Sequence, residues 1–138
     1  MKQLFSSAPL YPEKALGIIR IAVGLLLAYH GLEVFDSEVM LGYLTWDVFK
    51  GNAGGFWVYL GKSSEFVAGV LLTLGLFTRL GAVITAGTLG YITFFVGNGK
   101  FWYEDQHPFM FVLFGALFFF TGPGAWSLDS LIKRSNPK

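Results

Sequence analysis

The chain has 138 residues, of which 54% are apolar and 14% are charged, and its formal net charge is +1. Because an ordinary soluble domain carries about 25% charged residues, this composition and a mean hydropathy of +0.56 favour a protein embedded in a lipid bilayer. The charge balance predicts no nucleic-acid partner, and the absence of cysteine excludes disulfides, thiol catalysis and cysteine-ligated metals.

Four apolar stretches follow one another along the chain, and each is expected to form a membrane-spanning helix. At about 1.5 Å per residue, a helix of 19 residues covers about 29 Å, close to the hydrocarbon thickness of a bilayer. The fourth stretch is the shortest, but Trp102 and Trp126 bracket it as interfacial anchors do. The sequence therefore predicts an all-α, integral membrane four-helix bundle with spans at 14–32, 56–77, 80–96 and 107–121 and an outward loop at 33–55.

The basic residues near the helix ends predict the orientation. Residues 1–13 are expected to be a retained cytoplasmic segment, because no small-x-small cleavage pattern follows the first span. A single domain, residues 14–132, and a basic tail, residues 133–138, follow it. By the positive-inside rule both termini are expected to be cytoplasmic, because the side that holds the termini carries more basic residues than the opposite side, which carries Lys50 and Lys100. The cytoplasmic set is Lys2, Lys14, Arg79, Lys133, Arg134 and Lys138.

Ionisable residues inside the spans are the candidates for a functional site. Each costs on the order of 2.5 to 3.5 kcal/mol in the hydrocarbon region, so each needs a partner. Glu65 and Lys62 lie one turn apart in the second span, and His30 lies near the end of the first. Counting the helical rise puts these three residues at one level in the outer half, and His107 at a similar level. Arg20 lies deeper, on a stripe of glycines that indicates a helix-packing face.

Two interpretations of this cluster stay open at this point. In the structural one, Lys62 and Glu65 neutralise each other, His30 donates to a carbonyl, and Arg20 snorkels or ties helix ends together. In the functional one, the residues line a polar chamber that opens outward and binds a small polar or quinone-like molecule or passes protons. Glu65 and His30 would then be the catalytic proton carriers, and the ligand-binding residues would be Arg20, Lys62 and His107.

Haem and metal chemistry have less support. His30 and His107 on facing helices would satisfy a bis-imidazole haem, but no further motif accompanies them. Glu104, Asp105 and His107 are close in sequence, yet a solvated acidic loop is the favoured interpretation, so no metal site is predicted. The sequence also lacks the serine-hydrolase, phosphate-loop and His-Glu-x-x-His motifs.

The residues just named, with their neighbours, resemble the DoxX family of small four-span bacterial membrane proteins. The resemblance covers about residues 14–132, and one departure from it is Glu33, where the family commonly has a Lys after the His-Gly pair. It rests on Gly17-Ile18-Ile19-Arg20 with Gly24, on His30-Gly31, on Glu65, on Gly75-Leu76-Phe77-Thr78-Arg79 and on Gly122-Pro123-Gly124-Ala125-Trp126-Ser127-Leu128-Asp129.

The resemblance implies a multi-pass protein of the bacterial cytoplasmic (inner) membrane, and Arg20, Glu65, Arg79 and Asp129 match family motif positions. We expect Arg79 and Asp129 to form an exposed ion pair worth about 0 to 1 kcal/mol. Gly122, Pro123 and Gly124 should end the fourth helix, because proline cannot continue it and glycine permits unusual φ. Ser127 should be the N-cap of a short amphipathic surface helix.

Three functional hypotheses follow. Some DoxX-like proteins are associated with quinone-linked oxidation or membrane oxidoreductase complexes, which implies a small redox subunit with a quinone and a redox partner protein. The alternatives are a non-enzymatic scaffold that docks a partner through the outward loop, and a small-solute transporter, which would need a homo-oligomer. No self-sufficient catalytic motif decides whether the chain is itself an enzyme.

Overall fold

The computed structural model describes residues 6–135, and within them the chain is entirely helical, with no β-strand. The all-α prediction is therefore confirmed for the described residues. Six α-helices and three shorter helical segments follow one another in this order: α1 Pro12–Gly31, η1 Leu32–Phe35, α2 Ser37–Tyr43, η2 Asp47–Phe49, α3 Gly54–Leu74, α4 Thr78–Tyr91, the π-helical η3 Ile92–Val96, α5 Gln106–Thr121 and α6 Leu128–Ser135.

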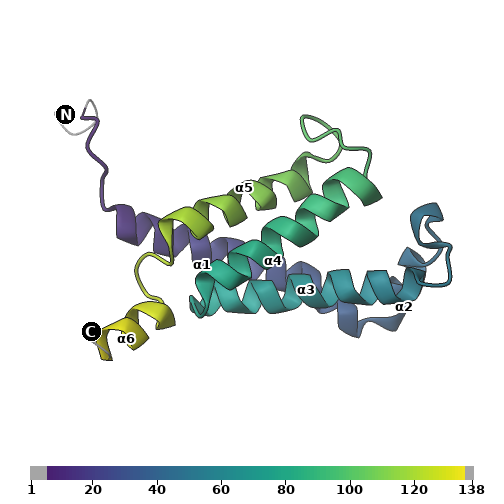
Figure 1. Ribbon diagram of the computed structural model, residues 1–138, viewed down its shortest axis with the longest axis horizontal. Coiled ribbons are helices and arrows are strands. Elements are labelled where there is room, and N and C mark those ends of the chain that lie inside the picture. The colour runs from purple at the N-terminus through teal and green to yellow at the C-terminus, as the bar shows by residue number, and fades with distance from the viewer. Residues whose placement is uncertain (1–5, 136–138) are drawn as a thin grey trace.

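The four long helices lie side by side in Figure 1. Helix α1 packs against α3, α3 against α4, and α4 against α5. The start of α1, the α3–α4 turn and α6 lie at one end of the bundle, which we call the terminal end. The α1–α3 connection and the α4–α5 loop lie at the opposite end, the loop end. Lys2 and Lys138, which contribute to the predicted orientation, lie outside the described residues.

The helix boundaries have local chemical causes. Helix α3 ends at Leu74 because Gly75 adopts a left-handed conformation, φ 62°, which closes a helix at little steric cost to glycine. In the loop at 33–55, α2 begins where the Asp36 carboxylate accepts hydrogen bonds from two backbone N–H groups of its first turn. The observed helices lie within a few residues of the predicted spans, and the loop contains structure of its own.

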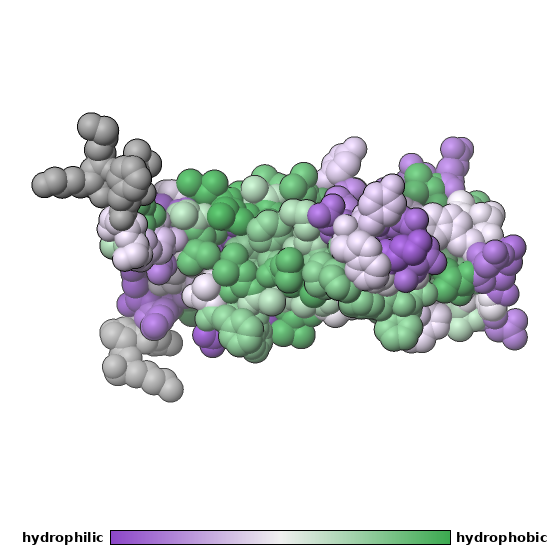
Figure 2. Space-filling model, turned by 90° about the horizontal axis from the view of Figure 1, so that it is seen from above, coloured by the Kyte–Doolittle hydropathy of each residue, from purple (hydrophilic) through white to green (hydrophobic). Residues whose placement is uncertain are grey.

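The surface of the bundle is mostly apolar between polar ends. Two segments of residues 6–135 are long and apolar enough to cross a membrane: Pro12–Phe35 and Thr78–Val96. Only 33% and 28% of their apolar windows are buried inside the protein, so the remainder needs an apolar solvent. Helix α5 is apolar but shorter, with 16 residues, and α3 contains Lys62 and Glu65. Figure 2 shows the apolar band, with hydrophilic residues gathered toward both ends.

Glycine allows α1 and α3 to come unusually close. A Cβ on Gly31 would overlap the backbone of Phe66, and one on Gly69 would lie 2.6 Å from Ala28 Cα. Gly24 faces α3 just as closely. The predicted packing role of the glycine stripe on the first helix is thus confirmed, and small residues are what such an interface in a membrane requires.

We expect Gly69→Ala to destabilise the bundle, because the added methyl would force α1 and α3 apart. The free energy of unfolding should fall by about 1–3 kcal/mol, the usual cost of overpacking. Thermal unfolding in detergent, followed by circular dichroism, measures this. Gly90→Ala is the matched control, since a Cβ there would meet its nearest neighbour, Val112 Cγ2, at an ordinary 3.9 Å. Equal stability of the two variants would contradict the close-packing interpretation.

Candidate functional site

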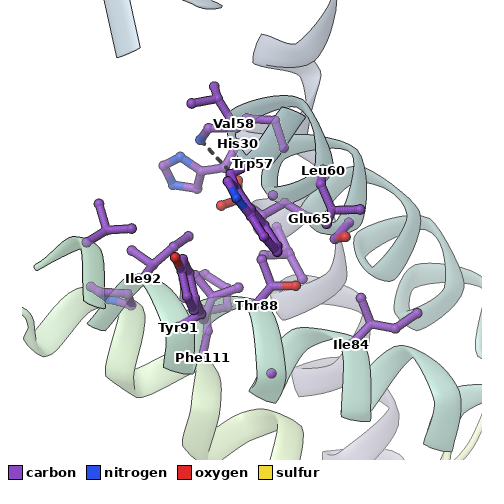
Figure 3. Close-up of a pocket in the computed structure, with 18 of the residues that line it drawn as sticks. His30, Trp57, Val58, Leu60, Glu65, Ile84, Thr88, Tyr91, Ile92 and Phe111 are labelled. Atoms are coloured by element: carbon purple, nitrogen blue, oxygen red, sulfur yellow. Dashed lines mark hydrogen bonds and ion pairs between the residues drawn. The ribbon is translucent and has the colours of Figure 1, made fainter. Parts of the chain in front are cut away.

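A cavity of about 580 Å³ lies among the four long helices, toward the loop end. Its volume lies within the range of small-molecule sites. The α1–α3 connection forms its roof through Tyr43, Trp46 and Phe49. Side chains from all four helices line one common space in Figure 3, among them His30 of α1, Glu65 of α3, Thr88 of α4 and Phe111 of α5.

One end of the cavity is a compact charged cluster. Lys62 Nζ lies 2.8 Å from Glu33 Oε2 and 3.1 Å from Glu65 Oε2, so one ammonium is shared by two carboxylates. Exposure of the side chains rises along this row, from 4% for Glu65 through 15% for Lys62 to 33% for Glu33. The row therefore connects a buried carboxylate to the surface of the loop end.

Tyr43 ties the roof of the cavity to this cluster. Its hydroxyl donates a hydrogen bond to Glu33 Oε2 at 2.6 Å, and its ring lies over Lys62 Nζ, 5.1 Å from the ring centroid. Burial, followed by the hydrogen bond to Glu33, raises the pKa of Tyr43. The hydroxyl therefore stays protonated at neutral pH and keeps donating.

The two histidines meet at the same end of the cavity. The ring centroids of His30 and His107 lie 5.4 Å apart at 70°, an edge-to-face contact, and both residues line the cavity. His107 is exposed at the start of α5, whereas His30 is partly buried. The depth count from helical rise thus placed His30, Lys62, Glu65 and His107 together correctly. With the rings in contact, no macrocycle fits between them in this arrangement.

The acidic α4–α5 loop is held by its own contacts. Asp105 accepts hydrogen bonds from the backbone N–H groups of Asn98 and Lys100, and Glu104 pairs with the Lys100 ammonium at 3.2 Å. These carboxylates are engaged in loop structure, in line with the interpretation of a solvated acidic loop.

Aromatic rings form another wall of the cavity. Trp57 of α3 and Tyr91 of α4 stack with centroids 6.3 Å apart at 22°, and Tyr91 stacks in turn on Phe95. Figure 3 shows the Trp57 and Tyr91 ring planes facing each other across the α3–α4 seam. Flat, polarisable surfaces of this kind suit a planar ligand.

Arg20 lies at the terminal end and does not line the cavity. Its side chain is fully buried, and it donates to Leu72 O and Thr73 O in the last turn of α3. It also donates to three carbonyl oxygens of the segment after α5, those of Pro123, Ala125 and Trp126, at 2.7–3.1 Å. Arg20 thus joins the end of α3 to the segment after α5 through backbone carbonyl oxygens of both. The predicted ligand-anchoring role is corrected to the structural alternative, in which Arg20 ties helix ends together.

Asp129 has a different partner from the one predicted. Its carboxylate accepts hydrogen bonds from Phe77 N and Thr78 N, each at 2.8 Å, and so caps the start of α4. Among the described ion pairs none joins Asp129 to Arg79, which is exposed. The expected ion pair is therefore wrong, because the helix N-terminus offers two donors that a carboxylate satisfies at once.

The segment after α5 adopts the predicted turn. Helix α5 ends at Thr121, Gly122 has φ 83° and Gly124 has φ 66°, as expected for the Gly122-Pro123-Gly124 stop. Ser127 Oγ accepts a hydrogen bond from Ser130 N at 3.2 Å, which confirms it as the cap of α6.

Comparison with known proteins agrees with this organisation. The DoxX family model matches residues 15–98, from α1 through η3. A protein of Mycobacterium tuberculosis, described as the uncharacterized membrane protein Rv3486, is 30% identical over 130 residues, which cover 84% of this chain and 80% of that protein. The chain belongs to the DoxX family. No solved structure matches it significantly.

As a DoxX-family protein, the chain is a membrane protein, and the matched region contains the charged cluster of the cavity. The family match includes Glu33, Lys62 and Glu65, whereas His107 and the segment that binds Arg20 lie beyond it. In this chain the cation beside Glu65 comes from α3 itself, through Lys62, and Glu33 is its second partner.

Sequence reasoning missed three cavity residues, Tyr43, Trp57 and Tyr91, and Glu33, which pairs with Lys62 at the edge of the cavity. Glu33 stands out only as a departure from the family's Lys, and Tyr43 only as an aromatic residue in a loop. Trp57 and Tyr91 resemble ordinary interfacial aromatics. The one usable signal was Glu33, since an acidic residue directly after a span and near Lys62 in depth is a candidate ion-pair partner.

We expect Arg20→Lys to destabilise this DoxX-family protein strongly while leaving the cavity residues intact. A lysine ammonium can reach fewer of the five carbonyls, and each lost hydrogen bond to a charged donor costs about 1.5–3 kcal/mol. Denaturant unfolding in micelles should show a loss of about 3 kcal/mol or more. Arg79→Lys, at an exposed position, is the control. A stability equal to that control would refute the structural role of Arg20.

Proposed function

We propose that the cavity binds a small planar amphiphilic molecule such as a quinone, and that the protein is a membrane subunit of a redox system. The observation that supports this is the cavity itself, which combines stacked aromatic walls with a charged, largely buried end. A bundle that needed only stability would avoid the cost of burying these charges. Small-molecule sites commonly pair such apolar walls with a few convergent polar groups.

The residues of the charged end suit proton exchange with a bound ligand. A quinone that is reduced to a quinol takes up two electrons and two protons. We assign the electrons to a partner redox protein, and the protons to the groups in the cavity. Glu65 and the His30–His107 pair would hold protons beside the ligand oxygen, while Lys62 and Glu33 connect them to the loop end. His107 is exposed and would exchange protons with water.

We further propose that the domain, residues 14–132, crosses the bacterial cytoplasmic membrane four times with both termini inside. Support comes from the side-by-side, alternating up-and-down arrangement of the four long helices and from the basic residues of the terminal end, Lys14, Arg79, Lys133 and Arg134. Helix α5 is short, yet Trp102 and Trp126 beyond its ends are exposed as interfacial anchors would be. In this topology the cavity and its roof face outward.

Glu65→Gln should abolish ligand binding or weaken it at least about tenfold, because the amide can neither accept a proton nor carry charge. Binding of a short-chain benzoquinone is measured by quenching of tryptophan fluorescence, since Trp46 and Trp57 line the cavity. The variant should remain folded, because Lys62 keeps Glu33 as a partner. Glu38→Gln, on the exposed face of α2, is the control. Unchanged affinity in the Glu65 variant would count against the proposal.

Single-cysteine variants test the topology cleanly, because the chain contains no cysteine. A membrane-impermeant maleimide added to intact cells should label Ser37→Cys, at the start of α2. It should label Ser135→Cys, at the end of α6, only after the cells are lysed. The reverse pattern would invert the proposed orientation, and labelling of both from outside would exclude an even number of spans.

A further inference from the structure

The cavity has an apolar arm that leads away from its charged end. This arm lies between α3 and α4, and its lining includes the apolar Leu60, Val83 and Ile84 together with the hydroxyl-bearing Ser64 and Thr88. In Figure 3, Leu60 and Ile84 lie on the far side of Glu65 from His30. The cavity is therefore charged at one end and mainly apolar at the other, a distribution that matches the head and tail of an amphiphile.

Two glycines face each other along this arm. The Trp57–Tyr91 stack sets the register of the two antiparallel helices. Four residues further along α3 is Gly61, and four residues back along α4 is Gly87, so the two lie opposite each other. A Cβ on either would meet no atom within 4 Å, and both line the cavity. The seam therefore has a place where neither helix contributes a side chain.

This opening is bounded at both ends and faces the apolar surface of the bundle. The Trp57–Tyr91 stack closes it toward the loop end. Toward the α3–α4 turn the helices touch again, since a Cβ on Gly81 would lie 3.1 Å from Leu71 Cβ. Gly87 is exposed, and Leu60 and Val83 are 44% and 52% exposed although they line the cavity. The cavity wall and the outer surface of the bundle thus share residues here.

We propose that the gap between Gly61 and Gly87 is a lateral window through which a ligand dissolved in the lipid enters, leaving its long apolar tail between α3 and α4. This rests on the proposed function and narrows its ligand class to molecules with a planar polar head and a long apolar tail. The alternative route, along the bundle axis, passes the roof formed by Tyr43, Trp46 and Phe49, which the Tyr43–Glu33 hydrogen bond holds in place. Each carbon of a tail that lies in the window buries apolar surface of the tail and of the protein, which favours binding.

The test compares two benzoquinones with the same head, one without a tail and one with an isoprenoid tail that carries a photoreactive diazirine. Both are bound to the full chain in lipid nanodiscs. Gly87→Leu fills the window from α4, where a new side chain meets open space and where leucine favours the helix more than glycine does. Gly42→Leu is the matched control, since Gly42 of α2 also faces open space but does not line the cavity.

We expect Gly87→Leu to lower the affinity for the tailed probe about tenfold or more, and the affinity for the tailless probe by less than about threefold. Photolysis in the unmodified protein should attach the tail within residues 60–64 and 83–88. Attachment within residues 43–49, or equal losses for both probes, would overturn the window while leaving the quinone site in place. If the tailed probe binds the unmodified protein no more tightly than the tailless probe, the window is likewise overturned and the quinone site remains. Failure of both probes to bind the unmodified protein would overturn the proposed function and the window with it.

Discussion

The close packing of α1 against α3 is the contact on which both ends of the protein depend. Gly31 and Gly69 leave no side chain between the two backbones. At that separation Arg20 reaches carbonyls in the last turn of α3, and Glu33 reaches Lys62 in the first half of α3. A wider gap would leave a buried cation at one end and an incompletely paired cluster at the other, both of which are costly away from water. One packing face thus positions the structural anchor and the candidate site together.

The charges at the two ends differ in what surrounds them. Within residues 6–135, the hydrogen bonds that Arg20 donates all go to backbone carbonyl oxygens, which cannot change their protonation state. Lys62 is held by two carboxylates, and the two imidazoles line the same cavity. The terminal end is therefore suited to holding the fold, whereas the loop end gathers acidic and basic side chains around the candidate site. Burial alone therefore does not distinguish the structural cation Arg20 from the residues of the candidate site.

Much of the architecture could be read from the sequence, because hydrophobic length and helical rise depend on the chain alone. The helices, the glycine face of α1 and the common depth of His30, Lys62, Glu65 and His107 follow from counting residues. The partners of Arg20 and Asp129 could not be found by counting residues, since they depend on how the helices are rotated about their axes and on the paths of the loops. Tyr43 comes from a loop whose path no periodicity encodes, and Arg20 binds carbonyls more than 100 residues away in sequence.

The long separation between Arg20 and its acceptors has a consequence for biosynthesis. Ala125 lies 105 residues after Arg20, and at about 5–20 residues per second a ribosome needs roughly 5–20 s to add them. During that interval the guanidinium of the newly inserted first helix lacks three of its final acceptors. The nascent chain must then keep this charge near lipid phosphates or in the insertion machinery until translation finishes. Completion of the last helix and its trailing turn would thus be the step that commits the first helix to its final position.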